Sequence, residues 1–326
     1  MPPSDVSAPE PTPAPGLAIL GCGNLGTALL CGVLASIQTY DPTSPTISTN
    51  SNKSSSNPTS TDSLPTKLTI PKNFAAYTRT SASAARVSTA IASFPTAVSV
   101  LHGADALAAI NADIIILGCQ PADLETCLGK DEIRKAVRGK HLISILAGVT
   151  ISDIEAILQI PGDDRPSTTV IRAMPNTASF VRESMTVIEA PEGTSVHTLQ
   201  MVDWLFGSIG TVRHITASTF DTCTALCAST PAFFAVILEA LIDGAVALGL
   251  DRENAQVMAA QAMKGSAELV LSGEHPSIVK EKITTPGGST IRGILKLEEG
   301  NMRAVMAGTL IECKMAAERL GSKKKG

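Results

Sequence analysis

Aromatic and charged side chains are scarce in this sequence of 326 residues, which has one Trp, two Tyr and seven Phe. Charged residues make up 17% of the chain, and the formal net charge is −4. A nucleic-acid-binding protein normally carries a dense basic patch. The one basic run, Lys323 to Lys325, lies in the C-terminal segment 323–326, which we expect to be a solvated tail. We therefore expect no nucleic-acid partner.

Paired cysteines and metal-binding histidine motifs are also missing. The seven Cys include no C-x-x-C pair and the five His include no H-E-x-x-H, so we expect no metal site. Isolated thiols are typical of a reducing compartment. Residues 1–15 are Pro-rich, lack the basic and apolar regions of a signal peptide, and are expected to be disordered. We expect a cytoplasmic protein.

Long apolar runs without charge do not occur either. The most apolar segment, Ala232 to Leu250, contains Glu239 and Asp243, and such acids are costly inside a bilayer. We expect this segment to be a buried helix, and we expect no membrane partner.

The order of elements predicts two domains. Over 16–214, short apolar runs alternate with helical segments, which favours an α/β Rossmann domain with a doubly wound, mainly parallel sheet. A stretch rich in Ser, Thr, Asn and Pro, 41–66, is expected to be a flexible insertion in it. Ser152 and Glu155 have the spacing of a capping box for a helix beginning near Ile154. The predicted strands are Leu17 to Leu20, Asn73 to Arg79, Asp113 to Leu117, His141 to Leu146, Thr168 to Ala173, Met185 to Glu189 and Thr211 to His214.

Residues 215–322 contain only helical patterns and predict an all-α domain. Pro231 opens a long helix and Gly249 follows it, the favourable ends for these two residues. Asp251 is the expected cap of the next helix. Several of these helices are apolar nearly all round, so they need partner surfaces. We therefore expect a homodimer or a larger ring.

A glycine-rich turn follows the first predicted strand and opens a helix. It consists of Gly21, Cys22, Gly23, Asn24, Leu25 and Gly26, which fits G-x-G-x-x-G. In this context Gly21 permits a tight turn, Gly23 lets the backbone approach a pyrophosphate, and Gly26 allows close packing. A plain glycine turn would match the same letters. We predict a dinucleotide site.

The end of the second predicted strand indicates which dinucleotide binds. NAD sites usually have an acid there for the ribose 2′-hydroxyl. This chain instead has Arg79, Thr80 and Ser81, and a guanidinium beside hydroxyls suits a 2′-phosphate. The alternative is a surface Arg in a turn. The pattern favours NADPH.

Five segments together resemble the pyrroline-5-carboxylate reductase family. They are Ala18 to Gly26, Ile114 to Pro121, Ser144 to Ile151, Val170 to Thr177 and Thr284 to Ile291. The resemblance implies hydride transfer from NADPH to the C=N carbon of 1-pyrroline-5-carboxylate, which gives proline. It also implies an active site between the Rossmann cleft and helices supplied partly by a second subunit. Further cofactor contacts are expected at Gly118, Cys119, Gln120, Pro121 and Ala147.

The segment Pro286, Gly287, Gly288, Ser289 and Thr290 precedes a predicted helix. Successive backbone N–H groups at a helix start bind an anion, here the substrate carboxylate, although an ordinary helix cap would look similar. The resemblance implies that Thr290 hydrogen-bonds near the imine nitrogen and that Asn176 and Ser229 line the substrate pocket. An imine takes its proton largely from solvent, so positioning supplies most of the catalysis.

Three positions depart from the family pattern. Gln120 stands where Lys is usual, Thr230 where Gly is usual, and Ala178 where Pro is usual. A methylated or otherwise modified pyrroline carboxylate, or another cyclic imine, therefore remains an alternative substrate. A β-hydroxyacid dehydrogenase would use a Lys on the helix after Pro231, which has none up to Leu250. A catalytically silent NADP-binding sensor or scaffold would not need the Pro286 to Thr290 segment.

Overall fold

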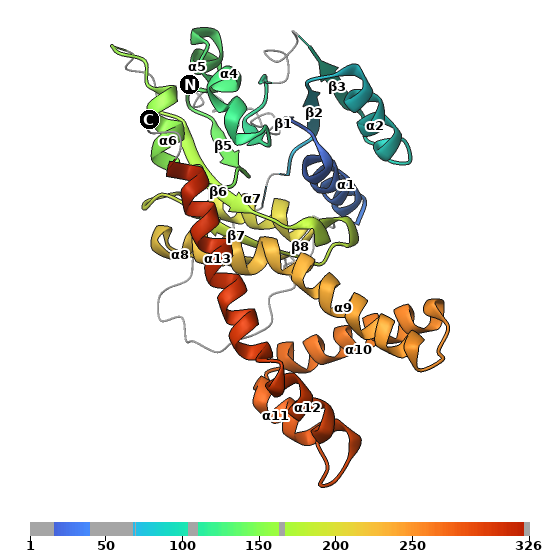
Figure 1. The fold of residues 1–326 in the computed structure, drawn as a ribbon. Coiled ribbons are helices and arrows are strands. Elements are labelled where there is room, and N and C mark those ends of the chain that lie inside the picture. Colours follow the sequence, from blue (N-terminus) through green and yellow to red (C-terminus); the bar gives the residue numbers. More distant parts are fainter. Residues whose placement is uncertain (1–15, 40–67, 69, 104–109, 163–166, 323–326) are drawn as a thin grey trace, which may run out of the picture.

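The computed structural model describes residues 16–39, 68, 70–103, 110–162 and 167–322 (Figure 1). The expectations for 1–15, for the insertion 41–66 and for the tail 323–326 therefore lie outside the described residues. The described part consists of one sheet flanked by helices, followed by a group of helices that extends away from the sheet.

The sheet has eight strands in the order β3-β2-β1-β4-β5-β6-β7-β8. All neighbouring pairs are parallel except β6 and β7, which are antiparallel. The expected Rossmann-type, mainly parallel sheet is confirmed. The strands are β1 (Gly16–Leu20), β2 (Asn73–Thr78), β3 (Val98–His102), β4 (Ile114–Leu117), β5 (His141–Ser144), β6 (Thr169–Met174), β7 (Ser184–Glu189) and β8 (Gly210–His214).

Both faces of the sheet are covered, which explains why its central strands are apolar runs without alternation. Along β4, Ile114 and Ile116 belong to one buried cluster, while Ile115 and Leu117 belong to the other. The first cluster also holds side chains of α1 (Asn24–Thr39) and α7 (Val196–Gly207). The second holds those of α4 (Leu124–Leu128), α5 (Asp131–Val137) and α6 (Ile151–Leu158). Helix α2 (Ser81–Ile91) packs beside β2 and β3.

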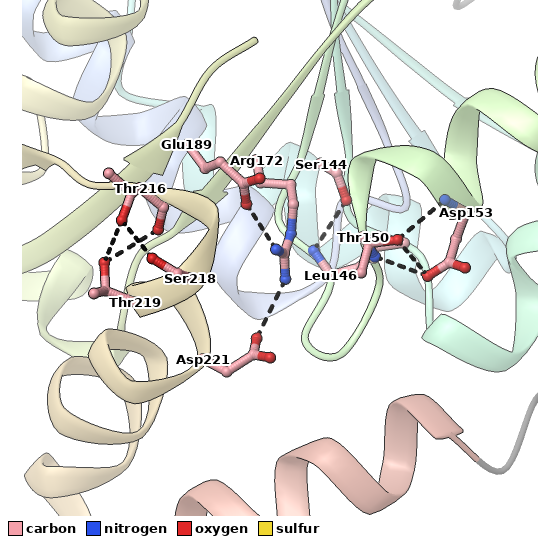
Figure 2. Close-up of polar contacts among 10 residues, drawn as sticks. All are labelled: Ser144, Leu146, Thr150, Asp153, Arg172, Glu189, Thr216, Ser218, Thr219 and Asp221. Carbon is pink, nitrogen blue, oxygen red and sulfur yellow. Dashed lines mark hydrogen bonds and ion pairs between the residues drawn. The ribbon is translucent and has the colours of Figure 1, made fainter. Parts of the chain in front are cut away.

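One local prediction was wrong. Helix α6 begins at Ile151 rather than near Ile154, and its capping box is formed by Thr150 and Asp153, not by Ser152 and Glu155. The Thr150 side chain accepts from the Asp153 amide at 3.1 Å, and the Asp153 carboxylate accepts from the Thr150 amide at 3.0 Å (Figure 2). Thr150 has extended backbone angles, so the helix starts directly after it.

The helical part begins where the sheet ends. It contains α8 (Ala217–Thr224), the π-helix η3 (Ala225–Ser229), α9 (Thr230–Ala247), α10 (Arg252–Leu271), α11 (Pro276–Ile283), α12 (Ser289–Glu299) and α13 (Met302–Ser322). Helices α11 and α12 lie at the end farthest from the sheet, and α13 returns from there to pack on α8 and η3 (Figure 1). The predicted cap is confirmed, since Asp251 accepts from the Asn254 amide at 3.0 Å.

The expectation of a buried helix near Ala232 is wrong for a single chain. Helix α9 has no buried residue. By length and composition alone, the continuous stretch Ala217–Ala247 is apolar enough to cross a membrane, and Glu239 and Asp243 do not prevent this. Among the described residues, all the exposed large hydrophobic side chains except Phe180, Val181 and Val196 lie in the helical part. An apolar surface of this extent needs a partner.

Candidate active site

The glycine turn lies at the topological switch point of the sheet, where successive strands stop being added on one side of β1 and are added on the other. Strand β1 is flanked by β2 on one side and β4 on the other, and at such a switch point the carboxyl ends of the strands form a crevice. The Gly118 amide donates to the Leu20 carbonyl at 2.7 Å and draws the two strand ends together. Gly21 has a φ of +84°, and a Cβ there would lie 2.6 Å from the Cys119 nitrogen. Only glycine fits this position.

Helix α1 begins directly after this turn. The amides of Asn24, Leu25 and Gly26 belong to its first turn, which has no intrahelical acceptor, and they can receive a phosphate. A Cβ on Gly23 would meet only the Gly21 oxygen, at 4.0 Å, so the approach to these amides is open. A Cβ on Gly26 would lie 3.1 Å from Ile19, because the helix packs closely on β1.

Cys22 faces the other way. Its side chain is buried in the core, and this burial raises the pKa of the thiol to about 11. Its amide and that of Gly21 both donate to the Tyr77 carbonyl, at 2.8 and 3.0 Å. Cys22 therefore anchors the turn to β2 and offers neither a reactive thiol nor a free amide.

Arg79 stands at the end of β2, on the rim of the crevice. Its side chain is 84% exposed, and Nη1 lies 3.5 Å from Oδ2 of Asp123, which follows β4. Thr80 caps α2 by accepting from the Ser83 amide at 3.2 Å, and Ser81 is the exposed first residue of that helix. Asp123 was missed in the sequence because 44 residues separate it from Arg79.

The other expected cofactor residues lie at the same edge. Cys119, Gln120 and Pro121 follow β4 and lead into the short 3-10 helix Pro121–Asp123. Gln120 is exposed and makes no side-chain capping bond there. Ala147 is exposed in the loop after β5. Parallel strands bring these loops together at one edge of the sheet.

Asn176 is buried in the loop after β6 and joins that loop to the helical part. Its Oδ1 accepts from the Ala178 amide at 2.9 Å, and its Nδ2 donates to the Cys227 carbonyl at 2.8 Å. Cys227 lies in η3, and Ser229 ends it. The Ser229 hydroxyl accepts from the Cys313 thiol of α13 at 3.0 Å. Short π-helices are frequent at functional sites.

The segment from Pro286 to Thr290 forms a tight turn that leads directly into α12, whose first residues are Ser289 and Thr290. The Gly288 amide donates to the Thr285 carbonyl at 3.1 Å, and Gly287 has a φ of +69°. Gly288 is the N-cap and makes no side-chain capping bond, so the following amides are open. This segment lies far from the glycine turn of its own chain (Figure 1). Within one chain the structure does not bring the two halves of the expected site together.

Arg172 holds the sheet to the helical part beside the site. Its Nη1 lies 2.7 Å from Glu189 and its Nη2 lies 3.5 Å from Asp221 (Figure 2). Its guanidinium also stacks on the Phe220 ring. Among the described residues, no group of three or more His, Cys, Asp and Glu side chains could hold a metal ion.

A glycine turn at the switch point of a doubly wound sheet, with a basic side chain at the end of β2, defines an NADP-dependent oxidoreductase of the Rossmann class. Residues 16–148 match the family described as "NADP oxidoreductase coenzyme F420-dependent". Residues 217–320 match "Pyrroline-5-carboxylate reductase dimerisation", so the chain self-associates through its helical part.

Two curated relatives carry the name pyrroline-5-carboxylate reductase. One, from Lophium arboricola, is 44% identical over 94% of this chain and 93% of its own length. The other, from Neurospora crassa, is 40% identical over 94% of this chain and 92% of its own length. The chain belongs to the pyrroline-5-carboxylate reductase family. A solved structure of the Plasmodium falciparum pyrroline carboxylate reductase with NADP bound has the same fold, with a TM-score of 0.71 at 22% identity, covering 94% of this chain and 98% of its own.

Proposed function

We propose that this chain reduces the C=N bond of 1-pyrroline-5-carboxylate to give L-proline, with NADPH as the hydride donor. The observation that carries the proposal is the 44% identity with a relative of that name over 94% of the chain. The crevice supports the cofactor part of the proposal independently, because a Cβ on Gly23 would meet only the Gly21 oxygen, at 4.0 Å, which leaves the first amides of α1 open to a pyrophosphate.

The chain's own residues fit the cofactor. The amides of Asn24, Leu25 and Gly26 receive the pyrophosphate, and Arg79, Thr80 and Ser81 receive the 2′-phosphate. The loops Gly118 to Pro121 and Ala147 flank the crevice at the ends of β4 and β5. When bound, NADPH supplies the hydride, and the protein supplies orientation.

The substrate site is proposed to form between two chains. The segment Pro286 to Thr290 is remote from its own crevice, and the helical part that carries it self-associates. A second chain then presents the amides after Gly287 to the substrate carboxylate and the Thr290 hydroxyl to the imine nitrogen. Asn176 and Ser229 line the other side from the first chain.

No strong general acid is required by this arrangement. An imine is basic enough to be protonated from solvent before hydride arrives, so the protein needs only to hold the ring against the cofactor. Thr290 stabilises the protonated nitrogen by a hydrogen bond.

We propose two functional domains, 16–214 for the cofactor and 215–322 for association and substrate. We also propose the cytoplasm as the compartment. The support is that all seven cysteines are free thiols, which suits a reducing environment.

The first experiment measures NADPH oxidation at about 340 nm by purified protein with 1-pyrroline-5-carboxylate, with NADH in parallel. Fast turnover that prefers NADPH supports the proposal, and tight NADPH binding without turnover contradicts it. A methylated pyrroline carboxylate is run alongside, because Thr230 stands where the family has Gly. The Thr230 hydroxyl donates to the Leu226 carbonyl of η3.

A further inference from the structure

A chain of hydrogen bonds runs along the first turns of α2, next to the residues proposed to receive the 2′-phosphate. Thr80, which caps this helix, donates from Oγ1 to Ser83 Oγ at 3.1 Å. The Arg86 guanidinium donates from Nη2 to the same Ser83 oxygen at 2.9 Å. Helical side chains lean towards the N-terminus of their helix, so Arg86 places its charge over the turn that begins at Thr80.

The Ser83 hydroxyl keeps a proton for a ligand. Its oxygen already accepts from Thr80 and from Arg86, and the Ser83 amide donates to Thr80 Oγ1 at 3.2 Å. A hydroxyl has one proton to donate, and among the described residues no acceptor takes that of Ser83. A half-buried hydroxyl with an uncommitted proton, beside a guanidinium, suits a phosphate oxygen.

The two arginines of this region differ in their charge balance. Arg79 lies 3.5 Å from the Asp123 carboxylate, so part of its charge is already balanced. Arg86 is exposed, and in the part of the chain that the structure describes no carboxylate pairs with it. A phosphate monoester carries a charge of about −1.5 to −2 near pH 7, which one partly balanced guanidinium does not neutralise. Arg86 supplies further positive charge.

We propose that Arg86 is a second specificity-determining residue for the cofactor, and that Arg86 and Ser83 bind the 2′-phosphate of NADPH together with Arg79. Arg86 contributes a charge-assisted hydrogen bond from its guanidinium, and Ser83 contributes its hydroxyl proton. The ribose 2′-hydroxyl of NADH has no charge for Arg86 to neutralise, so these contacts favour NADPH. This assignment rests on the proposed NADPH site and concerns binding alone, not the reduction that follows.

The test measures binding to the full-length protein, without any pyrroline substrate. Isothermal titration calorimetry gives the dissociation constants of adenosine 2′,5′-bisphosphate and of adenosine 5′-monophosphate, two probes that differ only in the 2′-phosphate. The dissociation constants of NADPH and NADH are measured in parallel by nicotinamide fluorescence. The test variants are Arg86→Gln and Ser83→Ala. The matched control is Arg213→Gln, which removes the same charge from an exposed residue of β8, at the edge of the sheet far from β2.

We expect Arg86→Gln to raise the dissociation constants of adenosine 2′,5′-bisphosphate and NADPH by about tenfold, because a hydrogen bond to a charged group is lost. Ser83→Ala should weaken the same two ligands. Binding of adenosine 5′-monophosphate and of NADH should not change in either variant, and Arg213→Gln should alter no constant by more than about twofold, because a distant exposed charge is screened.

Three results would each overturn the assignment. One is that Arg86→Gln or Ser83→Ala binds the bisphosphate as the wild type does. Another is that they weaken both adenosine probes equally, since the side chains would then only support the loop. The third is that Arg213→Gln weakens the bisphosphate as much as Arg86→Gln does. Turnover of 1-pyrroline-5-carboxylate is measured separately, so a failure of the proposed reaction leaves these binding constants intact.

Discussion

The side-chain amide of Asn176 donates a hydrogen bond to the carbonyl oxygen of Cys227 at 2.8 Å. Pro231 has no N–H to offer that carbonyl, which lies four residues earlier in the helix. The loop after β6 thus satisfies an acceptor that the helical part leaves open. The bond fixes the π-helix, and with it Ser229, against the cofactor edge of the sheet.

Replacing Asn176 therefore destabilises the protein and weakens substrate binding. Asn176→Asp keeps the oxygen that caps the Ala178 amide but loses the donor to Cys227, so we expect a loss of about 1–3 kcal/mol in the free energy of unfolding. Asn176→Ala loses both bonds and is expected to cost more. Urea denaturation checks this order. Equal stability of Asn176→Asp and the wild type would remove Asn176 from this role.

Two glycines of the phosphate turn are expected to respond differently to alanine. Gly21→Ala places a Cβ 2.6 Å from the Cys119 nitrogen at a φ of +84°, so it should destabilise the fold by well over the roughly 1–2 kcal/mol of the conformation alone. Gly23→Ala meets only one atom, at 4.0 Å. It should leave the melting temperature unchanged and reduce NADPH affinity. Thermal unfolding and NADPH titration separate the two effects.

Arg79 is expected to set cofactor preference without contributing to stability. Its side chain is 84% exposed and pairs with Asp123 across 3.5 Å, a surface contact worth little. Arg79→Gln should lower kcat/KM for NADPH by about tenfold to a hundredfold, because a charged hydrogen bond to the 2′-phosphate is lost. The value for NADH should stay the same. A parallel loss with both cofactors would place the 2′-phosphate elsewhere.

The ion pair between Arg172 and Glu189 should be strongly coupled to folding. The Arg172 side chain is 5% exposed and the Glu189 side chain 12%, so Glu189→Ala leaves a buried guanidinium with only Asp221 at 3.5 Å (Figure 2). We expect a loss of about 3–5 kcal/mol in unfolding free energy. Asp221→Asn, at a side chain that is 45% exposed, is the matched control and should cost much less.

His214 contributes a pH-dependent term to stability. Its hydrogen bond with Asp203, at 2.6 Å, raises the pKa of the imidazole above 6.5. A raised folded pKa stabilises the protein fully below the unfolded value and loses this effect as pH rises through the folded value. His214→Gln should therefore cost about 0.5 kcal/mol near pH 5.5 and almost nothing near pH 9, since the pair is partly exposed. Urea titrations at both pH values test this. Asp203→Asn and the double variant complete a double-mutant cycle, which isolates the interaction free energy of the His214–Asp203 pair.

The sequence alone predicts the cofactor half of the site because its signals are local. Gly21, Gly23 and Gly26 are close neighbours in the chain, and the strand before them and the helix after them are apparent from the apolar pattern. Helix α7 was also accessible, because Ser195 caps it through the Thr198 amide, but this signal was overlooked. Strand β3 was missed. None of its residues is fully buried, so its sequence does not need the continuous apolar run that identifies the central strands.

Contacts between distant parts of the chain could not be predicted in this way. The bond from Asn176 to Cys227 spans 51 residues, and the thiol of Cys313 reaches Ser229 across 84. Neither residue pair has a local pattern that identifies its partner. The remoteness of Pro286 to Thr290 from its own crevice likewise depends on how α10, α11 and α12 extend from the sheet, which no local pattern records.

Because α12 lies at the end of the helical part away from the sheet, two damaged chains can complement each other. A Gly23→Ala chain has an impaired crevice but an intact Pro286 to Thr290 segment, and a Thr290→Val chain has the reverse. In a twofold dimer of the two, one of the two sites combines both intact halves. Co-expression should give about a quarter of wild-type activity from random pairing at an NADPH concentration that is too low for the Gly23→Ala enzyme, although each chain alone gives an impaired enzyme. Two mutations that each impair the enzyme, one in the cofactor half of the chain and one in the helical half, would then compensate for each other when the two variant chains are present together.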